Sequence, residues 1–349
     1  MFPTKALKIF QKYSHHLTVL AGAIALAIAV WMGISFITFI NTPLLDSGAQ
    51  SIDFVYTQGS SVRALVMRLY RKNILVHPLF FLTLAKMNGS IYHLQAGEYR
   101  IEPNMRPGEL LARMVKGEGI MHAFTIVEGW TFQQVIKTLN NNSYVEHTLA
   151  GLPNDALMRA IGHEGEMPEG RFAADTYLFH AGIKDATLLK LAYKFLAERL
   201  AKEWQGRALN LPYRCSYDAL IAASIIEKET AIPEERVKIA GVIVRRLEKN
   251  MPLEMDPTVI YAKTHDFSAP YQLTKTDLAE DSLYNTYLHK GLPPTPISMP
   301  SKSSINAALH PENSDVLYYV AKGDGSKEHV FSAHYKEHQV AVKQLRMKQ

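Results

Sequence analysis

The sequence offers little that would hold a metal, a disulfide or a nucleic acid. Its one cysteine, Cys215, excludes an intramolecular disulfide and leaves no cysteine-based metal site. The formal net charge of only +5 does not support nucleic-acid binding, and no lysine-rich run suggests binding to lipid head groups. His310, His329 and His338 lack metal-ligand spacing, so we expect them in structural or cleft-rim positions. We therefore expect no cofactor, and a fold that relies on its own hydrophobic core.

One long apolar run stands out near the N-terminus. Residues 17–40 contain no charged side chain, and at about 1.5 Å per residue a helix of this length spans a bilayer core of roughly 30 Å. The run is longer than the apolar core of a signal peptide and no small-x-small cleavage site follows it, which favours an uncleaved anchor over a signal peptide. Lys5, Lys8 and Lys12 precede the run, whereas residues 41–46 contain no basic residue. The positive-inside rule therefore predicts a cytoplasmic N-terminus and an extracytoplasmic remainder.

An apolar helix that ends in two carboxylates is the most unusual local pattern. Residues 219–226 are almost all apolar, which is typical of a helix buried on every side. Glu227 and Glu229 follow at its C-terminal end, where the helix dipole disfavours an ionised carboxylate. Because Glu229 lies over Ile225 and Ile226, we expect burial to raise its pKa and to produce a general acid. The alternative is that both glutamates only cap a buried helix end.

This helix and the segments after it resemble the signature of the endolytic murein transglycosylases, the MltG or YceG-like family. The resemblance covers almost the whole chain and rests on several motifs that occur in the family's order. They are Glu169–Tyr177 (with Ala174 in place of the usual proline), Ala223–Thr230 with Glu235 and Arg236, Asp256–Tyr261, Tyr284–Tyr287, Gly291–Pro294, His310 with Pro311, and Leu317–Ala321.

The resemblance implies a lyase, a lytic transglycosylase that cuts within nascent peptidoglycan strands near the membrane and limits their elongation. Glu229 stands in the family's catalytic position. It would protonate the oxygen that bridges N-acetylmuramic acid and N-acetylglucosamine, and would then take the proton of the muramoyl C6 hydroxyl, which closes on C1 as a 1,6-anhydro end. The resemblance also implies a bacterial inner-membrane protein with a periplasmic catalytic domain. Its partners would be glycan strands and peptidoglycan synthases, and not nucleic acid.

Further residues of these motifs are candidates for substrate binding. They are Glu227, Asp256, Tyr261, Tyr284, Asn285 and Tyr287. The tyrosines offer flat apolar faces with polar tips, and Asn285 offers both a donor and an acceptor to an acetamido group. Asp256 would order the cleft or stabilise the positive charge that develops at C1. A packed or hydrogen-bonded structural role is the alternative for each of them.

Two other functions stay open on the sequence. Glu227 and Glu229 are two residues apart and point to different faces of a helix, so they make a poor acid–nucleophile pair. Asp256 is a candidate second carboxylate, and a hydrolase that produces reducing ends is therefore one alternative. A catalytically silent, glycan-binding scaffold that recruits peptidoglycan synthases is the other.

The region next to the membrane contains an internal repeat. Phe54–Val62 corresponds to Phe124–Phe132, and each copy predicts a strand, a glycine turn and an amphipathic helix. Such units resemble the family's LysM-like region, which we place at residues 41–150. Glycan contact and a mere spacing role are both open for it.

The chain is therefore predicted to be an α+β protein with an N-terminal transmembrane helix. A cytoplasmic tail, residues 1–16, precedes the span, and a mixed α+β catalytic domain occupies residues 151–349. The glutamate helix is expected to be buried in that domain. Prolines forbid long helices beyond residue 250, which indicates a loop-rich cleft wall around it.

Overall fold

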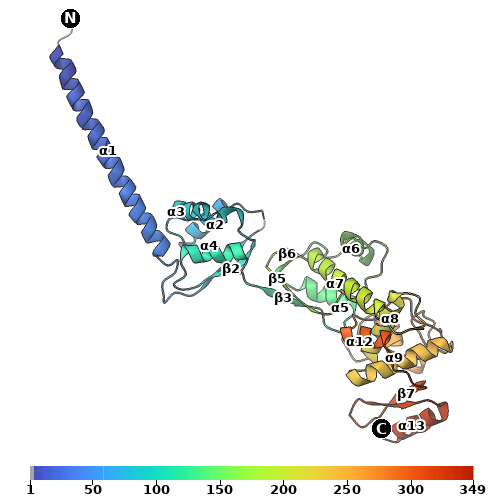
Figure 1. Ribbon diagram of the computed structural model, residues 1–349. Coiled ribbons are helices and arrows are strands. Elements are labelled where there is room, and N and C mark those ends of the chain that lie inside the picture. Colours follow the sequence, from blue (N-terminus) through green and yellow to red (C-terminus); the bar gives the residue numbers. More distant parts are fainter. Residues whose placement is uncertain (1–3, 58, 349) are drawn as a thin grey trace. The chain divides into compact units, whose positions relative to one another are not determined.

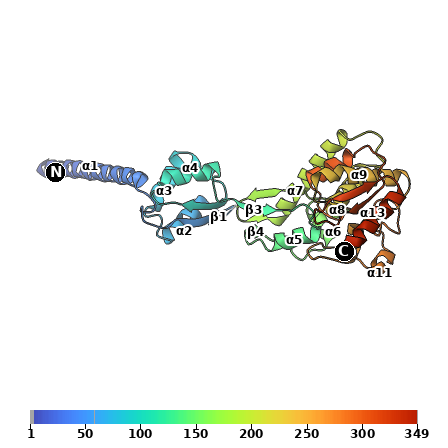
Figure 2. The same ribbon diagram turned by 90° about the horizontal axis from the view of Figure 1, so that it is seen from below.

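The computed structural model describes residues 4–57 and 59–348 (Figures 1 and 2). Its contacts form two compact units. The first runs up to His122 and includes His180–Gly182, and the second begins at Ala123. The contacts thus group the second copy of the repeat with the glutamate helix, whereas the sequence suggested a boundary near residue 150.

The first unit begins with the long helix α1, Thr4–Asn41. Among the described residues, α1 is the one helix long and apolar enough to cross a membrane, over Leu17–Asn41. Its apolar side chains are mostly exposed, and Phe39 near its end is buried against the rest of the unit. These features are consistent with the predicted membrane helix.

The remainder of the first unit is a small α/β fold around one hydrophobic core. Its strands β1 and β2 pair antiparallel, with Phe54 opposite Tyr99 and their rings stacked at 5.9 Å. Leu65 and Leu110 bring two amphipathic helices onto this core. The elements are β1 (Ile52–Tyr56), α2 (Val62–Arg71), α3 (Pro78–Met87), the 3-10 turn η1 (Ser90–Tyr92), β2 (Gly97–Ile101) and α4 (Pro107–Lys116).

The second unit begins with short strands and the helices that pack beside them. β3 pairs with β5, and β4 runs parallel to β6. The elements are β3 (His122–Thr125), α5 (Phe132–Asn140), β4 (Val145–Glu146), α6 (Asn154–Ala160), β5 (Thr176–Phe179), β6 (Ile183–Lys184) and α7 (Asp185–Gln205). Phe132 and Phe172 stack at 5.3 Å in the core beneath α5.

The glutamate helix α8, Ser216–Glu229, lies in the interior of the second unit. Every residue from Asp218 to Ile226 is buried, as the apolar pattern predicts. Its neighbours are α9 (Pro233–Glu248), α10 (Asp256–Thr264), α11 (Lys275–Ala279), α12 (Lys302–Leu309), β7 (Tyr318–Ala321), β8 (His329–Ser332) and α13 (Tyr335–Lys348). The short helices and long loops between α9 and α12 agree with the proline content of this region.

Candidate active site

Glu229 is the last residue of α8, and Thr230 after it is already extended. Its Oε1 atom is buried and has no hydrogen-bond partner within the part of the chain that the structure describes. The pKa of Glu229 is raised to about 7, because burial outweighs the lowering effect of a hydrogen bond from Tyr319 and the nearby charge of Asp256 adds to the rise. A raised pKa is the direction expected from the position of Glu229 over the apolar residues Ile225 and Ile226. A carboxyl group with such a pKa is protonated in part at neutral pH and can donate a proton.

Tyr319, Asp256 and Tyr287 lie near enough to Glu229 to interact with it electrostatically. Asp256 is the first residue of α10 and is exposed, and its Oδ1 accepts a hydrogen bond of 2.6 Å from the Tyr287 hydroxyl. Tyr319 lies on β7, and its buried hydroxyl contacts Met255 Sδ at 2.8 Å. The cluster thus contains one buried carboxyl group and one exposed carboxylate. Two phenols accompany them, and burial raises the pKa of both.

Glu227 faces a different part of the second unit. Its Oε2 accepts a hydrogen bond of 2.8 Å from the Ser301 N–H, at the start of α12. Its Oε1 lies 3.3 Å from Nη2 of Arg236 on α9. Both partner side chains of this ion pair are nearly buried. The carboxylate thereby joins α8 to α9 and α12, and it points away from the face expected of an acid–nucleophile partner.

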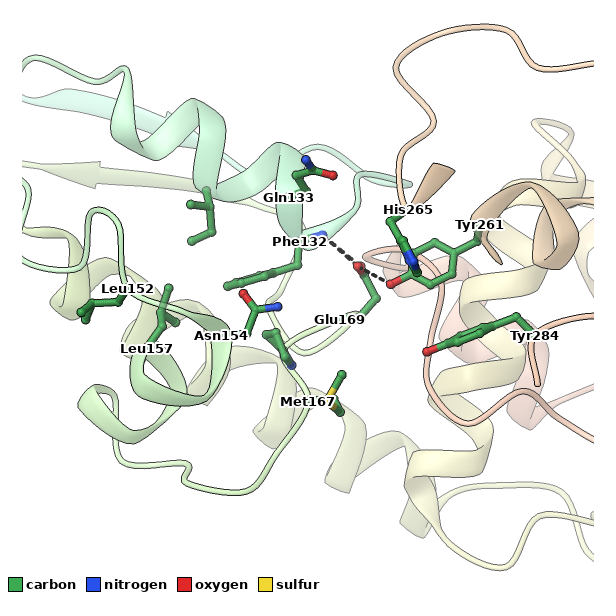
Figure 3. A pocket seen from close by; sticks show the side chains of 12 residues that line it. Phe132, Gln133, Leu152, Asn154, Leu157, Met167, Glu169, Tyr261, His265 and Tyr284 are labelled. Atoms are coloured by element: carbon green, nitrogen blue, oxygen red, sulfur yellow. Dashed lines mark hydrogen bonds between the residues drawn. The ribbon is translucent and has the colours of Figure 1, made fainter. Parts of the chain in front are cut away.

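A pocket of about 470 Å³ lies beside Tyr261, and Glu169 forms part of its wall (Figure 3). Glu169 accepts hydrogen bonds from the Phe132 N–H at 3.0 Å and from the Tyr261 hydroxyl at 3.0 Å. Its side chain therefore connects the first residue of α5 to α10. Burial raises the pKa of Glu169 to about 7, against the effect of these hydrogen bonds.

The pocket combines apolar walls with a few polar groups. Tyr284 and His265 line it next to Tyr261, whose ring centroid lies 5.1 Å and 5.0 Å from theirs. In Figure 3 Asn154 lies near Leu152 and Leu157, and Gln133 lies beside Phe132 at the start of α5. Such a lining suits a ligand with both apolar faces and polar edges.

Helix α10 connects this pocket to the Glu229 cluster. Asp256 begins the helix near Glu229, and Tyr261 lies five residues later, which is about 7.5 Å along a helix axis. Lys228, between the two glutamates, places its Nζ 4.1 Å from the centroid of Phe267, a neighbour of Tyr261. Both parts of the candidate site thus belong to one packed body.

Asn285 and Tyr284 are engaged by the protein itself. The buried Asn285 donates from Nδ2 to the carbonyls of Leu278 and Glu280, and its Oδ1 accepts from the Tyr287 N–H at 3.0 Å. The Tyr284 hydroxyl lies 2.8 Å from Oγ1 of Thr295. The donor and acceptor that the sequence offered to an acetamido group are therefore occupied by the loop that carries Tyr287.

Two residues of the site escaped sequence reasoning. The sequence analysis included Tyr319 only as part of the Leu317–Ala321 motif, and no sequence pattern indicated a role for Met255. Among the C-terminal histidines, His329 pairs through Nδ1 with Glu235 at 2.7 Å, and His338 stacks on Tyr318.

Comparison with known proteins shows which family the chain belongs to. Residues 54–344 match the YceG-like family. The chain is 30% identical over 325 residues to the endolytic murein transglycosylase of Bacillus subtilis (strain 168), which covers 86% of each chain. It is 28% identical to the endolytic murein transglycosylase of Streptococcus pneumoniae (strain R6), covering 81% of this chain and 57% of the relative. A crystal structure of a putative yceG-like protein from Listeria monocytogenes superposes with a TM-score of 0.53 at 28% identity, covering 83% of this chain and 98% of that one. The chain therefore belongs to the YceG-like family.

Proposed function

We propose that this protein is an endolytic lytic transglycosylase of peptidoglycan, and therefore a lyase. The observation that carries the proposal is the buried Glu229 carboxyl group, whose pKa is raised to about 7 and whose Oε1 has no partner among the described residues. A single group that donates and then accepts a proton meets the needs of this reaction. The names of the two relatives support the same activity.

In the proposed reaction Glu229 first gives its proton to the oxygen between N-acetylmuramic acid and N-acetylglucosamine. The bond from the muramoyl C1 to this oxygen breaks, and the N-acetylglucosamine part leaves with the proton. The Glu229 carboxylate then takes the proton of the muramoyl C6 hydroxyl as its oxygen bonds to C1. The carboxyl group is restored and no water is consumed.

Asp256 and the neighbouring pocket have supporting roles in this proposal. The exposed Asp256 carboxylate, held by Tyr287, stabilises the positive charge that develops at C1. The pocket at Tyr261 and Tyr284 receives an adjoining part of the glycan strand against its aromatic faces. Glu227 and Asn285 keep the surrounding loops in position through their contacts within the protein.

The location follows from α1 in the same proposal. α1 crosses the inner membrane once, with its N-terminus in the cytoplasm and the part of the chain after α1 on the periplasmic side. The LysM-like part of the chain then lies close to newly made strands, and peptidoglycan synthases are its neighbours. Cleavage there limits the elongation of strands.

Mass spectrometry of digested peptidoglycan tests the function directly. Full-length wild-type protein should release internal fragments that end in 1,6-anhydromuramic acid, and Glu229→Gln should lower the rate by roughly 10²- to 10⁴-fold. The exposed Glu234→Gln, one helix later, is the matched control and should retain activity.

Other products would redirect the assignment. Reducing ends would contradict the transglycosylase and indicate a hydrolase in which Asp256 activates water. Glycan binding without cleavage by the wild type would indicate a scaffold.

A further inference from the structure

The segment after α1 has an unusual charge composition. Residues 54–97 contain five basic side chains and no acidic one. They are Arg63, Arg68, Arg71, Lys72 and Lys86. The sequence shows no lysine-rich run because these residues are dispersed, yet the segment as a whole has a formal charge of +5. A surface of this composition attracts anionic groups.

Helix α3 in this segment exposes apolar side chains on its outer face. Leu79 and Met87 are 75% and 69% exposed, and Val76 just before the helix is 71% exposed. Leu79 and Met87 are eight residues apart, with Thr83 midway between them, and therefore lie on one stripe of the helix. The opposite face, with Phe81 and Ala85, is buried in the core of the unit. The side of a helix that faces water is normally polar, so an exposed apolar stripe indicates contact with an apolar environment.

The inner end of this stripe adjoins α1 at the level where a membrane span would leave the bilayer core. Phe80 packs against Phe36 at 5.6 Å and Phe39 at 5.8 Å between ring centroids. The candidate span runs over 25 residues from Leu17 to Asn41, and Phe36 and Phe39 lie in its last two turns. α3 therefore meets α1 near the outer end of the span.

A groove of about 430 Å³ continues the apolar surface of α1 toward the start of α3. Trp31, Ile34 and Phe39 of α1 line it together with Ile74 and Val76. The lipid-facing side of the span thus passes directly into the exposed stripe, without an intervening charged side chain among the residues that line the groove.

We propose that α3 lies in the outer interface of the membrane that α1 crosses. Leu79 and Met87 enter the boundary of the acyl chains, and Arg71, Lys72 and Lys86 contact the phosphate groups of anionic phospholipids. This inference rests on the proposed membrane anchor. It makes the first unit a body held at the membrane by two elements, whereas a span alone leaves it free to tilt.

Depth-dependent fluorescence quenching on full-length protein in vesicles tests the inference. In a Cys215→Ser background, single cysteines replace Leu79, Met87, Trp31 or Leu209, and each carries an environment-sensitive label. Trp31 reports the span, and Leu209, which is 89% exposed in the second unit, is the matched aqueous control. Labels at Leu79 and Met87 should be quenched several-fold more by nitroxide lipids than the label at Leu209, and less by aqueous iodide.

The other results separate the inference from the anchor. Iodide quenching at Leu79 equal to that at Leu209, with lipid quenching at Trp31, would overturn the interfacial helix and leave the anchor standing. Protection of Leu79 from both quenchers would also overturn it, because a protein surface would then cover the stripe. A Trp31 label that lipids do not quench would remove the anchor itself.

Contact between the basic side chains and anionic head groups is tested by comparing vesicles of two lipid compositions. In vesicles with anionic phospholipid, the combined Arg71→Gln, Lys72→Gln and Lys86→Gln changes should lower the lipid quenching at Leu79. In vesicles of phosphatidylcholine alone, the same changes should have little effect. An equal response in both kinds of vesicle would contradict contact with anionic head groups.

Discussion

Glu229 combines an acid's pKa with a fixed position at a helix end. The dipole of α8 and the apolar residues beneath the side chain predicted the direction of its pKa from sequence alone, because both lie within one helical turn. The raised pKa of Glu169 was not predictable in this way. Its partners Phe132 and Tyr261 lie 37 and 92 residues away in the chain, and only the folded structure brings them together.

The pKa of Glu229 sets the pH range of activity. Because the protonated form donates the first proton, activity should fall as pH rises through about 7 and by about tenfold per unit above it. The measurement is the rate of release of anhydro ends between pH 5 and pH 9, with Glu234→Gln as a control of unchanged profile. A rate that stays constant to pH 9 would show that Glu229 is not the acid.

At the level of secondary structure, the helices were the most predictable elements. Apolar residues at helical spacing in the two repeat copies predicted α2 and α5, and the apolar run of residues 219–226 predicted α8. The two-residue strands β4 and β6 escaped prediction, because their parallel pairing depends on a partner 38 residues away and not on a local pattern.

The last turn of α9 holds the loop that leads to Asp256. Arg246 is almost completely buried and donates to the carbonyls of Pro252, Leu253 and Leu317 at 2.9–3.0 Å. Arg246→Lys cannot reproduce this planar set of donors, and a carbonyl left unsatisfied should cost about 1–3 kcal/mol.

Arg246→Lys should also alter catalysis. The Pro252 and Leu253 carbonyls that Arg246 binds lie in the loop that leads to Asp256, and the Leu317 carbonyl lies just before β7, which carries Tyr319. We expect a lower kcat and a displaced pH profile, whereas a purely structural role would lower the amount of folded protein alone. Thermal unfolding and the pH profile together make this distinction. Arg159→Lys, on the exposed surface, is the matched control and should change neither.

On the scale of the whole molecule, the chain has separate hydrophobic cores. One core contains Phe54, Leu65 and Leu110 in the first unit, and two others lie in the second. The sequence predicted a LysM-like region at residues 41–150 and a catalytic domain at 151–349. The repeat pattern describes each copy alone and does not specify which core the helix of the second copy joins.

Separate cores predict separate responses to core substitutions. Leu110→Ala should destabilise the first unit by about 2–5 kcal/mol, and Ile225→Ala should do the same in the second. Hydrogen exchange followed by mass spectrometry should show faster exchange only in peptides of the substituted unit. Faster exchange throughout the chain after either substitution would indicate a single cooperative structure.

Several of the residues that helix α8 buries in the core have small side chains. Ala219, Ala222 and Ala223 are completely buried there, and larger residues would overpack the site at a cost of about 1–3 kcal/mol. We therefore expect few amino acids to be tolerated along this helix, for two unrelated reasons. Glu229 is needed for the chemistry, and the alanines are needed because no larger side chain fits. Surveys that rank positions by their intolerance to change will score these alanines beside Glu229, and the amount of protein in the cell will distinguish the two groups.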